Sequence, residues 1–439
     1  MSKNNNTTNS TDMANVLYSL PVTKQTINRA IVALTLHCHG SYRGIQSFLE
    51  DIFDYKISIG SIHNIQQDVC AKADRINKSA DLSPVEIGAH DEIFQGREPV
   101  LIGGCTQSTY CYLLKKEDSR DGTTWGMNLL DLKEQGFDPE TVIGDGGQGL
   151  RAGLMAADFK AEFRSDIFHA VQDFTKVLFY CTNRAYGAMT KRFVLERKMI
   201  KAKKKNRGHQ YSKNLVRARA NETRAVKVAE TLETLLEWLR NDVLAIVGPD
   251  HAIRSKLFDF IVEELRNIQK LASHHVEKLI AKMANRKDTL IKFALEVAQR
   301  LAAVAMQYNV EKELVTAVYS LQNIPLESTF LWCRLDQLKN KLGNLYYPIE
   351  IATQEIIETT VRASSIAENI NSRLRPYFFL MKQFGQKALN LVRFYLNHKP
   401  FLRSARDERV GKSPAEILSG KPHSHWLAML GFTLFKRTA

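Results

Sequence analysis

Three acidic residues in this chain have the types and sequence surroundings of a metal-dependent phosphoryl-transfer site. Asp91 comes late in one strand-like run, Asp145 ends another, and Glu368 lies in a helix-like stretch. Carboxylates from two neighbouring strand ends and one helix can hold two hard cations through oxygen alone, leaving positions open for water and a scissile phosphate. The three residues therefore predict phosphodiester chemistry with two bound Mg²⁺ or Mn²⁺ ions.

The third motif places a carboxylate and a guanidinium on the same helix face. Glu368, Asn371 and Arg375 are separated by three and then four residues, so they share a face two turns long. Glu368 would then bind metal while Arg375 holds a phosphate. Pro376 follows directly, and we expect it to end or kink this helix. A solvated polar helix face would show the same pattern.

The segment from residue 85 to about 173 is predicted to form the strands and the helix that position Asp91 and Asp145. Three strand-like runs are followed by a helix and a short returning strand that delivers Asp145. Asp91 shares a strand face with alternate apolar residues, so its charge would be costly to bury without a cation. Glu92 points to the opposite face and is the weaker candidate. This order of elements is how a ribonuclease-H-like core begins.

Two segments near these motifs have competing interpretations. The run 144–149, Gly-Asp-Gly-Gly-Gln-Gly, fits the glycine pattern of a dinucleotide-binding turn, but such a fold should begin with that strand rather than follow three antiparallel ones. Residues 165–173 are expected to form a fifth strand running into a helix. His169 in this segment could shuttle a proton or contact DNA, although a structural role is favoured.

In this order the motifs resemble those of the DDE transposases of bacterial insertion sequences, in which a long helical insertion interrupts the ribonuclease-H-like core. The resemblance spans most of residues 85 to 432 and rests on 90–92, 143–146, Glu368 with Asn371 and Arg375, 394–401, and 411–418. It implies an enzyme that binds the ends of its own element, cuts them by metal-dependent hydrolysis and joins the 3′-hydroxyl to target DNA. The alternatives are a nuclease of this fold without strand transfer and a transposase-derived DNA-binding regulator.

The predicted fold class is an α/β core with a mixed sheet, an N-terminal helix-turn-helix domain and an all-α insertion domain. The expected parts are a disordered tail at 1–13, the helix-turn-helix domain at 14–80, the first part of the core at 81–175, the basic segment and helical insertion at 176–355, and the last part of the core with the C-terminal tail at 356–439.

A helix-turn-helix is predicted from two short amphipathic stretches. Ser41 could cap the first helix, and Ser58 or Ser61 could begin the second. The second helix would turn four polar residues outward, His63, Asn64, Gln66 and Gln67. Among the residues of this helix, Ser61, Asn64 and Gln67 are the candidates for DNA contact. An ordinary helical hairpin has the same apolar spacing.

Charge also indicates a nucleic-acid partner. The formal net charge is +14, and residues 191–227 alone hold fourteen Lys and Arg against two Glu. Lys203, Lys204, Lys205 and Arg207 are expected to grip phosphates of double-stranded DNA. A flexible solvated loop is the alternative for this block.

The rest of the sequence indicates the expected cellular location, the state of the cysteines and the assembly. No apolar run reaches transmembrane length and no signal-peptide pattern is present, so we expect a soluble bacterial protein of the cytoplasm, associated with the nucleoid. The six cysteines lack zinc-site or redox spacing and should be reduced. Because two element ends must be processed together, we expect a homodimer or a larger assembly on DNA.

Overall fold

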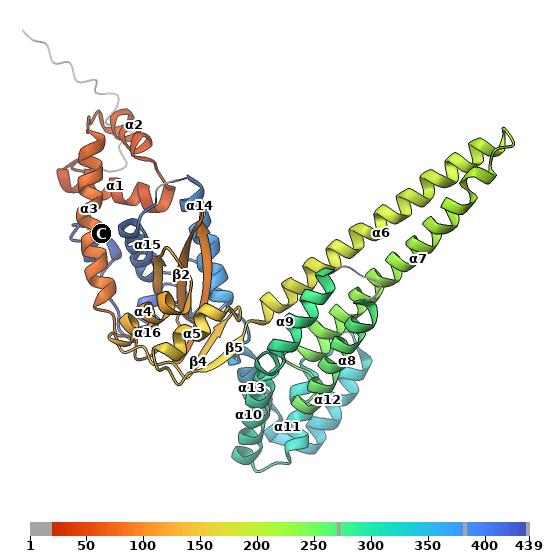
Figure 1. The fold of residues 1–439 in the computed structure, drawn as a ribbon. Helices are drawn as coiled ribbons and strands as arrows, with labels where there is room; N and C mark the ends of the chain where they lie inside the picture. The colour runs from red at the N-terminus through yellow and green to blue at the C-terminus, as the bar shows by residue number, and fades with distance from the viewer. Residues whose placement is uncertain (1–19, 270–273, 381–383, 436–439) are drawn as a thin grey trace, which may run out of the picture.

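The computed structural model describes residues 20–269, 274–380 and 384–435, so the tail expected at 1–13 lies outside the described residues. A lobe that holds the sheet and the N-terminal helices adjoins an all-helical lobe, from which two long helices project as a hairpin (Figure 1). Within the described ranges, no helix is both long and apolar enough to cross a membrane.

Five strands form one mixed sheet in the order β3-β2-β1-β4-β5. The strands are β1 (Ile87–Gln95), β2 (Glu98–Cys105), β3 (Cys111–Lys116), β4 (Thr141–Gly144) and β5 (Glu162–Ser165). β1 pairs antiparallel with β2, and β2 with β3, whereas β4 pairs parallel with both β1 and β5. The predicted meander and returning strand are thus confirmed, and the topology is ribonuclease-H-like. It is not the parallel sheet of a dinucleotide-binding fold.

Helices cover both faces of the sheet. On one face, α4 (Gly122–Lys133) and α5 (Gln148–Ala156) pack through a cluster that includes the buried Trp125. On the other face lie α14 (Ser365–Leu380) and α15 (Gln386–His398). A Cβ atom at Gly104 of β2 would lie 3.1 Å from Cγ1 of Ile366, so the lack of a side chain there lets α14 approach the sheet closely.

The helix that carries Glu368 does not end where the sequence predicted. Pro376 was expected to end or kink this helix, and α14 runs through it to Leu380, so the proline does not end the helix. Tyr377 is only 3 % exposed, and its hydroxyl donates a hydrogen bond of 2.7 Å to the Leu36 carbonyl. Proline has no backbone N–H, so the helix lacks one hydrogen bond at Pro376. The burial of Tyr377 and its hydrogen bond to Leu36 stabilise the last turn of α14 in spite of this loss.

From residue 20 onward, three helices precede the sheet, namely α1 (Lys24–Cys38), α2 (Tyr42–Phe53) and α3 (Ile59–Lys78). Ser41 and Ser58 cap α2 and α3 through their hydroxyls, as the sequence indicated. Gln66 was expected to face outward, and this is wrong. It is 6 % exposed and contacts the hydroxyls of Thr35 and Tyr42, because α1 packs over that side of α3.

The region between β5 and α14 is all-helical, as predicted. The hairpin consists of α6 (Ile167–Lys203) and α7 (His209–Trp238). The remaining helices of this lobe are α8 (His251–Gln269), α9 (His274–Ile291), α10 (Phe293–Tyr308), α11 (Lys312–Leu321), α12 (Thr329–Leu342) and α13 (Tyr346–Thr359). The expected boundaries at 175 and 355 fall inside α6 and α13, so the chain passes between core and insertion without a break in either helix.

Short elements complete the chain. They are a π-helical turn at Leu239–Val243, 3-10 turns at Gly343–Leu345 and Asp407–Arg409, and the helices α16 (Pro414–Ser419) and α17 (Trp426–Met429). Ser413 caps α16 with a full capping box, in which the Glu416 carboxylate accepts from the Ser413 backbone N–H. The tail motif that contributed to the resemblance is therefore a capped helix of the sheet lobe.

Candidate metal centre

Two of the three predicted acids meet where α14 crosses β1. Ligand atoms of Asp91, Glu368 and His169 all lie within 4.8 Å of one another. The Asn371 side chain, one turn beyond Glu368, donates a hydrogen bond of 2.7 Å to Oδ2 of Asp91. Arg375 lies 3.9 Å from the Glu368 carboxylate, and its side chain is 67 % exposed. The predicted common face of this helix is therefore real, with Arg375 at its solvent end.

Asp145 follows directly after β4 on the strand beside Asp91. The parallel register pairs Ala89 with Ile143, so extending it by two residues puts Asp91 across from Asp145. One carboxylate oxygen of Asp145 accepts a hydrogen bond of 2.7 Å from the Gly147 N–H. A Cβ atom at Gly147 would lie 2.9 Å from that oxygen, so a side chain there would displace the Asp145 carboxylate from this position. Asp145 is at the site's edge and is not part of the group of three.

The sequence suggested His169 as a proton shuttle or DNA contact but favoured a structural role, and the structure places it beside Asp91 and Glu368. Its Nε2 lies 3.9 Å from Oδ1 of Asp91, and its Nδ1 lies 3.0 Å from the Asp166 carboxylate. Asp166 is the N-cap of α6 and is buried, accepting also from the Phe168 N–H and from the hydroxyl and N–H of Ser364. An acid that caps a helix, with a histidine three residues later, is a signal that could have found this pair.

Asp166 also fixes the helix that carries Glu368. The Ser364 carbonyl accepts the Glu368 N–H at 3.1 Å, and the Ile167 N–H donates to the Arg362 carbonyl at 3.2 Å. The chain therefore leaves the core and returns to it at one hydrogen-bonded junction. This junction positions His169 and Glu368 together.

The electrostatics of the site favour a bound cation. Burial raises the pKa of Asp91 to about 6, and the neighbouring Glu368 and Asp145 add to this effect against the opposing influence of a backbone hydrogen bond and of His169. The hydrogen bond to Asp166 raises the pKa of His169 to about 9. Burial alone would raise the pKa of Asp166, but hydrogen bonds from His169 and Ser364 outweigh it and lower that pKa. The acids at the sheet edge thus repel one another unless positive charge is present.

The residues present fit a divalent cation. Asp91 and Glu368 offer carboxylate oxygens, and His169 offers an imidazole nitrogen only when it has lost its proton. The Asn371 carbonyl oxygen is buried and has no hydrogen-bond donor among the described residues, so an acceptor at this site is unused. Carboxylate and amide oxygens suit Mg²⁺ and Mn²⁺, while imidazole nitrogen suits transition metals.

The residues beside Asp91 on β1 face away from this centre. Glu92 accepts hydrogen bonds from Arg120 at 2.6 Å and from the Trp125 indole at 3.2 Å, on the face covered by α4. This placement agrees with its prediction as the weaker candidate. His90 is fully buried among aromatic rings, and burial lowers its pKa to about 3, so it is neutral at physiological pH.

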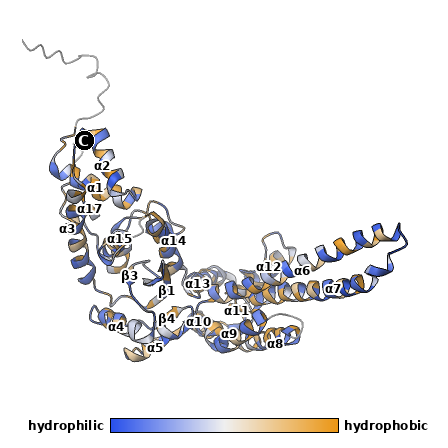
Figure 2. Cartoon of the chain, turned by 45° about the horizontal axis from the view of Figure 1, so that its top comes forward, coloured by the Kyte–Doolittle hydropathy of each residue, from blue (hydrophilic) through white to orange (hydrophobic). Residues whose placement is uncertain are grey.

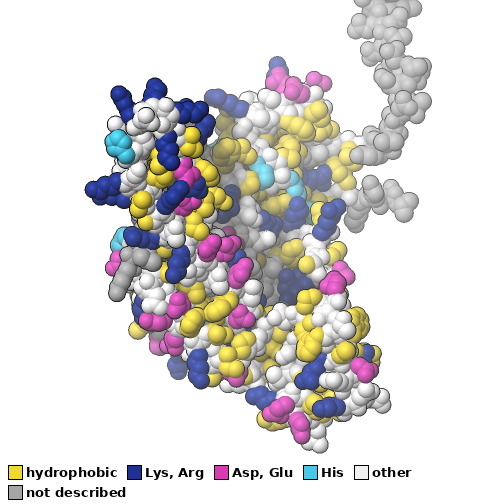
Figure 3. Space-filling model, turned by 90° about the vertical axis from the view of Figure 1, so that its right-hand side faces the viewer, with side chains coloured by type: hydrophobic (Ala, Val, Ile, Leu, Met, Phe, Trp, Pro, Cys, Tyr) yellow, Lys and Arg dark blue, Asp and Glu magenta, His cyan; other side chains and the backbone are white. Residues whose placement is uncertain are grey.

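The residues predicted to bind DNA lie on two other surfaces. In α3, Asn64 is exposed, Gln67 is half-buried, and the Ser61 hydroxyl is 2.9 Å from that of Ser58. Lys203 ends α6, and the three other basic candidates, Lys204, Lys205 and Arg207, lie in the turn at the hairpin tip. The basic block is therefore mostly helical rather than a long loop. Figure 3, which faces the hairpin tip, shows Lys and Arg side chains gathered at its upper left.

Comparisons of the sequence with protein-family models and with curated proteins found no match. The fold class therefore rests on the sheet topology, and the candidate metal centre rests on its geometry.

Adding Mg²⁺ or Mn²⁺ should raise the melting temperature at neutral pH, and the effect should fade below pH 6, because Asp91 then carries a proton, its pKa being about 6. Since the cation must displace this proton, metal affinity should fall about tenfold for each further pH unit. Differential scanning fluorimetry with metal titrations measures both effects. Glu98→Gln, which alters a carboxylate paired with Lys116 at the sheet edge, should respond like wild type. A full metal response in Asp91→Asn would place the cation elsewhere.

Proposed function

We propose that this protein is a DDE-type transposase that cuts the ends of its element and joins them to target DNA. The observation that carries the proposal is the meeting of Asp91 and Glu368, from opposite ends of the core, with ligand atoms within 4.8 Å on a ribonuclease-H-like sheet. Asp145, across the parallel strand pair from Asp91, would complete the set of three acids. Its glycine-rich turn would let a DNA backbone approach closely.

Each residue of this centre has a separate proposed role. Asp91, Glu368 and Asp145 hold cations, and Asn371 orients the Asp91 carboxylate through its amide. A divalent cation bound there supplies a Lewis acid that activates a water or a hydroxyl and stabilises the leaving oxygen. His169, charged and fixed by Asp166, places a positive group beside Asp91 where a phosphate would bind. Arg375 lies at the exposed end of the same helix face and is placed to hold a neighbouring phosphate.

Double-stranded DNA is the proposed partner, contacted by the N-terminal helices and the hairpin. Asn64 and Gln67 on α3 are the proposed base-reading residues. Both glutamates of the basic block already form ion pairs within the hairpin, Glu222 with Arg192 at 2.6 Å and Glu196 with Arg192 at 2.7 Å and with Arg219 at 2.9 Å. The two glutamates are thus neutralised, and the Lys and Arg side chains of the block outside these ion pairs are available to bind phosphates.

Strand transfer is the decisive test of this proposal. The protein would be incubated with Mg²⁺, a supercoiled target plasmid and precut DNA carrying the inverted repeats that flank its gene. Joined products support a transposase, whereas hydrolysis alone would indicate a nuclease of the same fold. If divalent cations produce neither reaction across a range of end sequences, the protein is a DNA-binding regulator with idle carboxylates.

Changing Lys203, Lys204, Lys205 and Arg207 together to Gln should weaken binding to any duplex without altering sequence preference. Clustered flexible cations meet phosphates as point charges, whereas base discrimination needs fixed donors in a groove. The slope of log K against log salt should flatten by about 0.9 for each phosphate that the protein no longer neutralises. Fluorescence anisotropy over a salt series measures the slope. An unchanged slope would remove the hairpin tip from the DNA interface.

A further inference from the structure

From its thirteenth residue onward, α6 carries a row of large apolar side chains that are more than half exposed among the described residues. Phe179, Tyr186, Phe193 and Ile200 follow one another at intervals of seven residues and are 68 %, 63 %, 54 % and 60 % exposed. We call these four side chains the α6 row. Figure 2 shows hydrophobic segments along this projecting part of the hairpin. An apolar side chain exposed once is ordinary, but a repeating series of large ones indicates an interaction surface.

The row is not part of the contact between the two hairpin helices. That contact buries small and aliphatic residues, Cys181 and Ala185 from α6 with Leu215 and Ala218 from α7. At 100° per residue, the row lies to one side of this contact. The two hairpin helices thus pack against each other without the row. The Arg192 guanidinium lies 3.8 Å from the centroid of the Phe193 ring.

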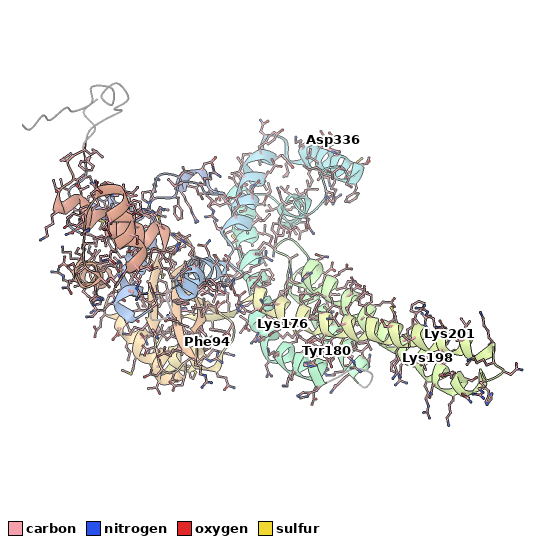
Figure 4. All side chains as sticks on the ribbon, turned by 90° about the horizontal axis from the view of Figure 1, so that it is seen from above. Phe94, Lys176, Tyr180, Lys198, Lys201 and Asp336 are labelled. Atoms are coloured by element: carbon pink, nitrogen blue, oxygen red, sulfur yellow. The ribbon has the colours of Figure 1, made fainter. Side chains whose placement is uncertain are left out.

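Several of the cations of α6 lie on its other side. Lys191 and Lys198 are exposed and stand roughly 150° around the helix from Phe193. Figure 4 labels Lys176, Lys198 and Lys201 along the hairpin. Arg197 is the one cation that falls in line with the row. The basic side can therefore meet phosphates while the apolar side remains free.

We propose that the α6 row is a self-association surface that pairs with the same row of a second copy of this chain. Side chains repeated every seven residues let two helices pack along a continuous seam. The row has almost no cations with which to hold phosphates, so duplex DNA fits the opposite side better. A two-fold axis would bring identical rows together and close the contact.

The size of the row predicts a weak association. It extends over about 31 Å, and each of its four side chains would bury on the order of 100 Å², which gives roughly 400 Å² per subunit. A standard stable interface buries about 800 Å² per partner. The +12 charge of residues 191–227 also opposes pairing of two hairpins. Salt and bound DNA should both strengthen the pair, because each screens or neutralises that charge while leaving apolar contacts intact.

Sedimentation velocity of the full chain in chelator, at low and high salt and with and without duplex DNA, tests the proposal. Phe193→Glu should weaken self-association about tenfold or more, and Phe193→Gln should weaken it too, which separates the loss of apolar packing from the added charge. The matched control is Val194→Glu, which makes the same charge change one residue away on the basic side, where Val194 is 45 % exposed. It should leave self-association close to wild type.

Three outcomes would overturn the pairing. The wild-type chain could stay monomeric under all conditions, or Phe193→Glu and Val194→Glu could have equal effects. The third outcome is a Phe193→Glu variant that loses DNA binding but keeps its self-association. The last result would assign the row to nucleic acid. Because no cleavage occurs in chelator, the test is independent of the proposed function. A chain that pairs through the row but never joins DNA would refute only the function, and a monomer that joins DNA would refute only the pairing.

Discussion

Asp91→Ala, Asp145→Ala and Glu368→Ala should each slow strand cleavage by about a thousandfold or more while leaving DNA affinity near wild type. Loss of a ligand removes cation charge from the transition state, where it is worth several kcal/mol. The residues proposed to contact DNA at the hairpin tip and on α3 lie on other surfaces, so those contacts should persist. Single-turnover cleavage of labelled end DNA and anisotropy measure the two quantities.

Glu92→Ala is the matched control for these variants. Glu92 is the carboxylate next to Asp91, but it bonds Arg120 and Trp125 on the opposite face of β1. Its removal should spare cleavage, apart from some loss of stability. A wild-type rate in any one of the three alanine variants would remove that residue from the site. The Asp145 variant is the most informative, because Asp145 lies outside the group of three.

Asp166→Ala should destabilise the protein by about 3 kcal/mol, measured by urea unfolding near neutral pH. The buried Asp166 carboxylate accepts from Phe168, His169 and Ser364, so alanine leaves several buried donors without a partner. Asp173→Ala is the control. It breaks partly exposed ion pairs with Lys282 at 2.9 Å and with Arg286 at 3.7 Å, and should cost less than about 1 kcal/mol.

The pH dependence of this loss of stability tests whether charged His169 is the partner of Asp166. The folded-state pKa of His169 is raised to about 9, so its contribution is complete below its ordinary value of 6.5 and is lost as pH rises through 9. The pKa of Asp166 is lowered, so its contribution is present above its ordinary value and is lost as pH falls through the folded-state pKa. The difference between wild type and Asp166→Ala should therefore shrink in alkali. A constant difference from neutral pH to above 9 would show that His169 is not the charged partner.

The sheet could be predicted from local sequence because each strand alternates or buries residues in a simple pattern. Asp91 was assigned to the α14 side of β1 by parity alone, and Glu92 to the other side, and both assignments agree with the structure. The spacing from Glu368 to Arg375 similarly placed both on one helix face. Periodicity is a local property, so one sequence suffices to predict these features.

Other features depended on contacts between distant segments. His169 approaches Asp91 only because β5 and α14 converge on Asp166, and no local pattern specifies that convergence. Gln66 became buried because α1 covers it, although its own helix pattern places it outside. The proline in α14 was tolerated because Tyr377 is held by the carbonyl of Leu36. In each case tertiary packing outweighed a local tendency.

One helix runs without interruption from the candidate metal centre to the basic tip of the hairpin, so its length fixes the distance between these two sites. α6 holds His169 in its first turn and Lys203 at its end. A straight helix between these residues spans about 51 Å at 1.5 Å per residue. At 3.4 Å per base pair, a straight duplex that touches both points covers about fifteen base pairs. If DNA binds as proposed, shorter duplexes would reach the tip or the centre but not both, and the length of α6 would set the shortest duplex that contacts the two sites at once.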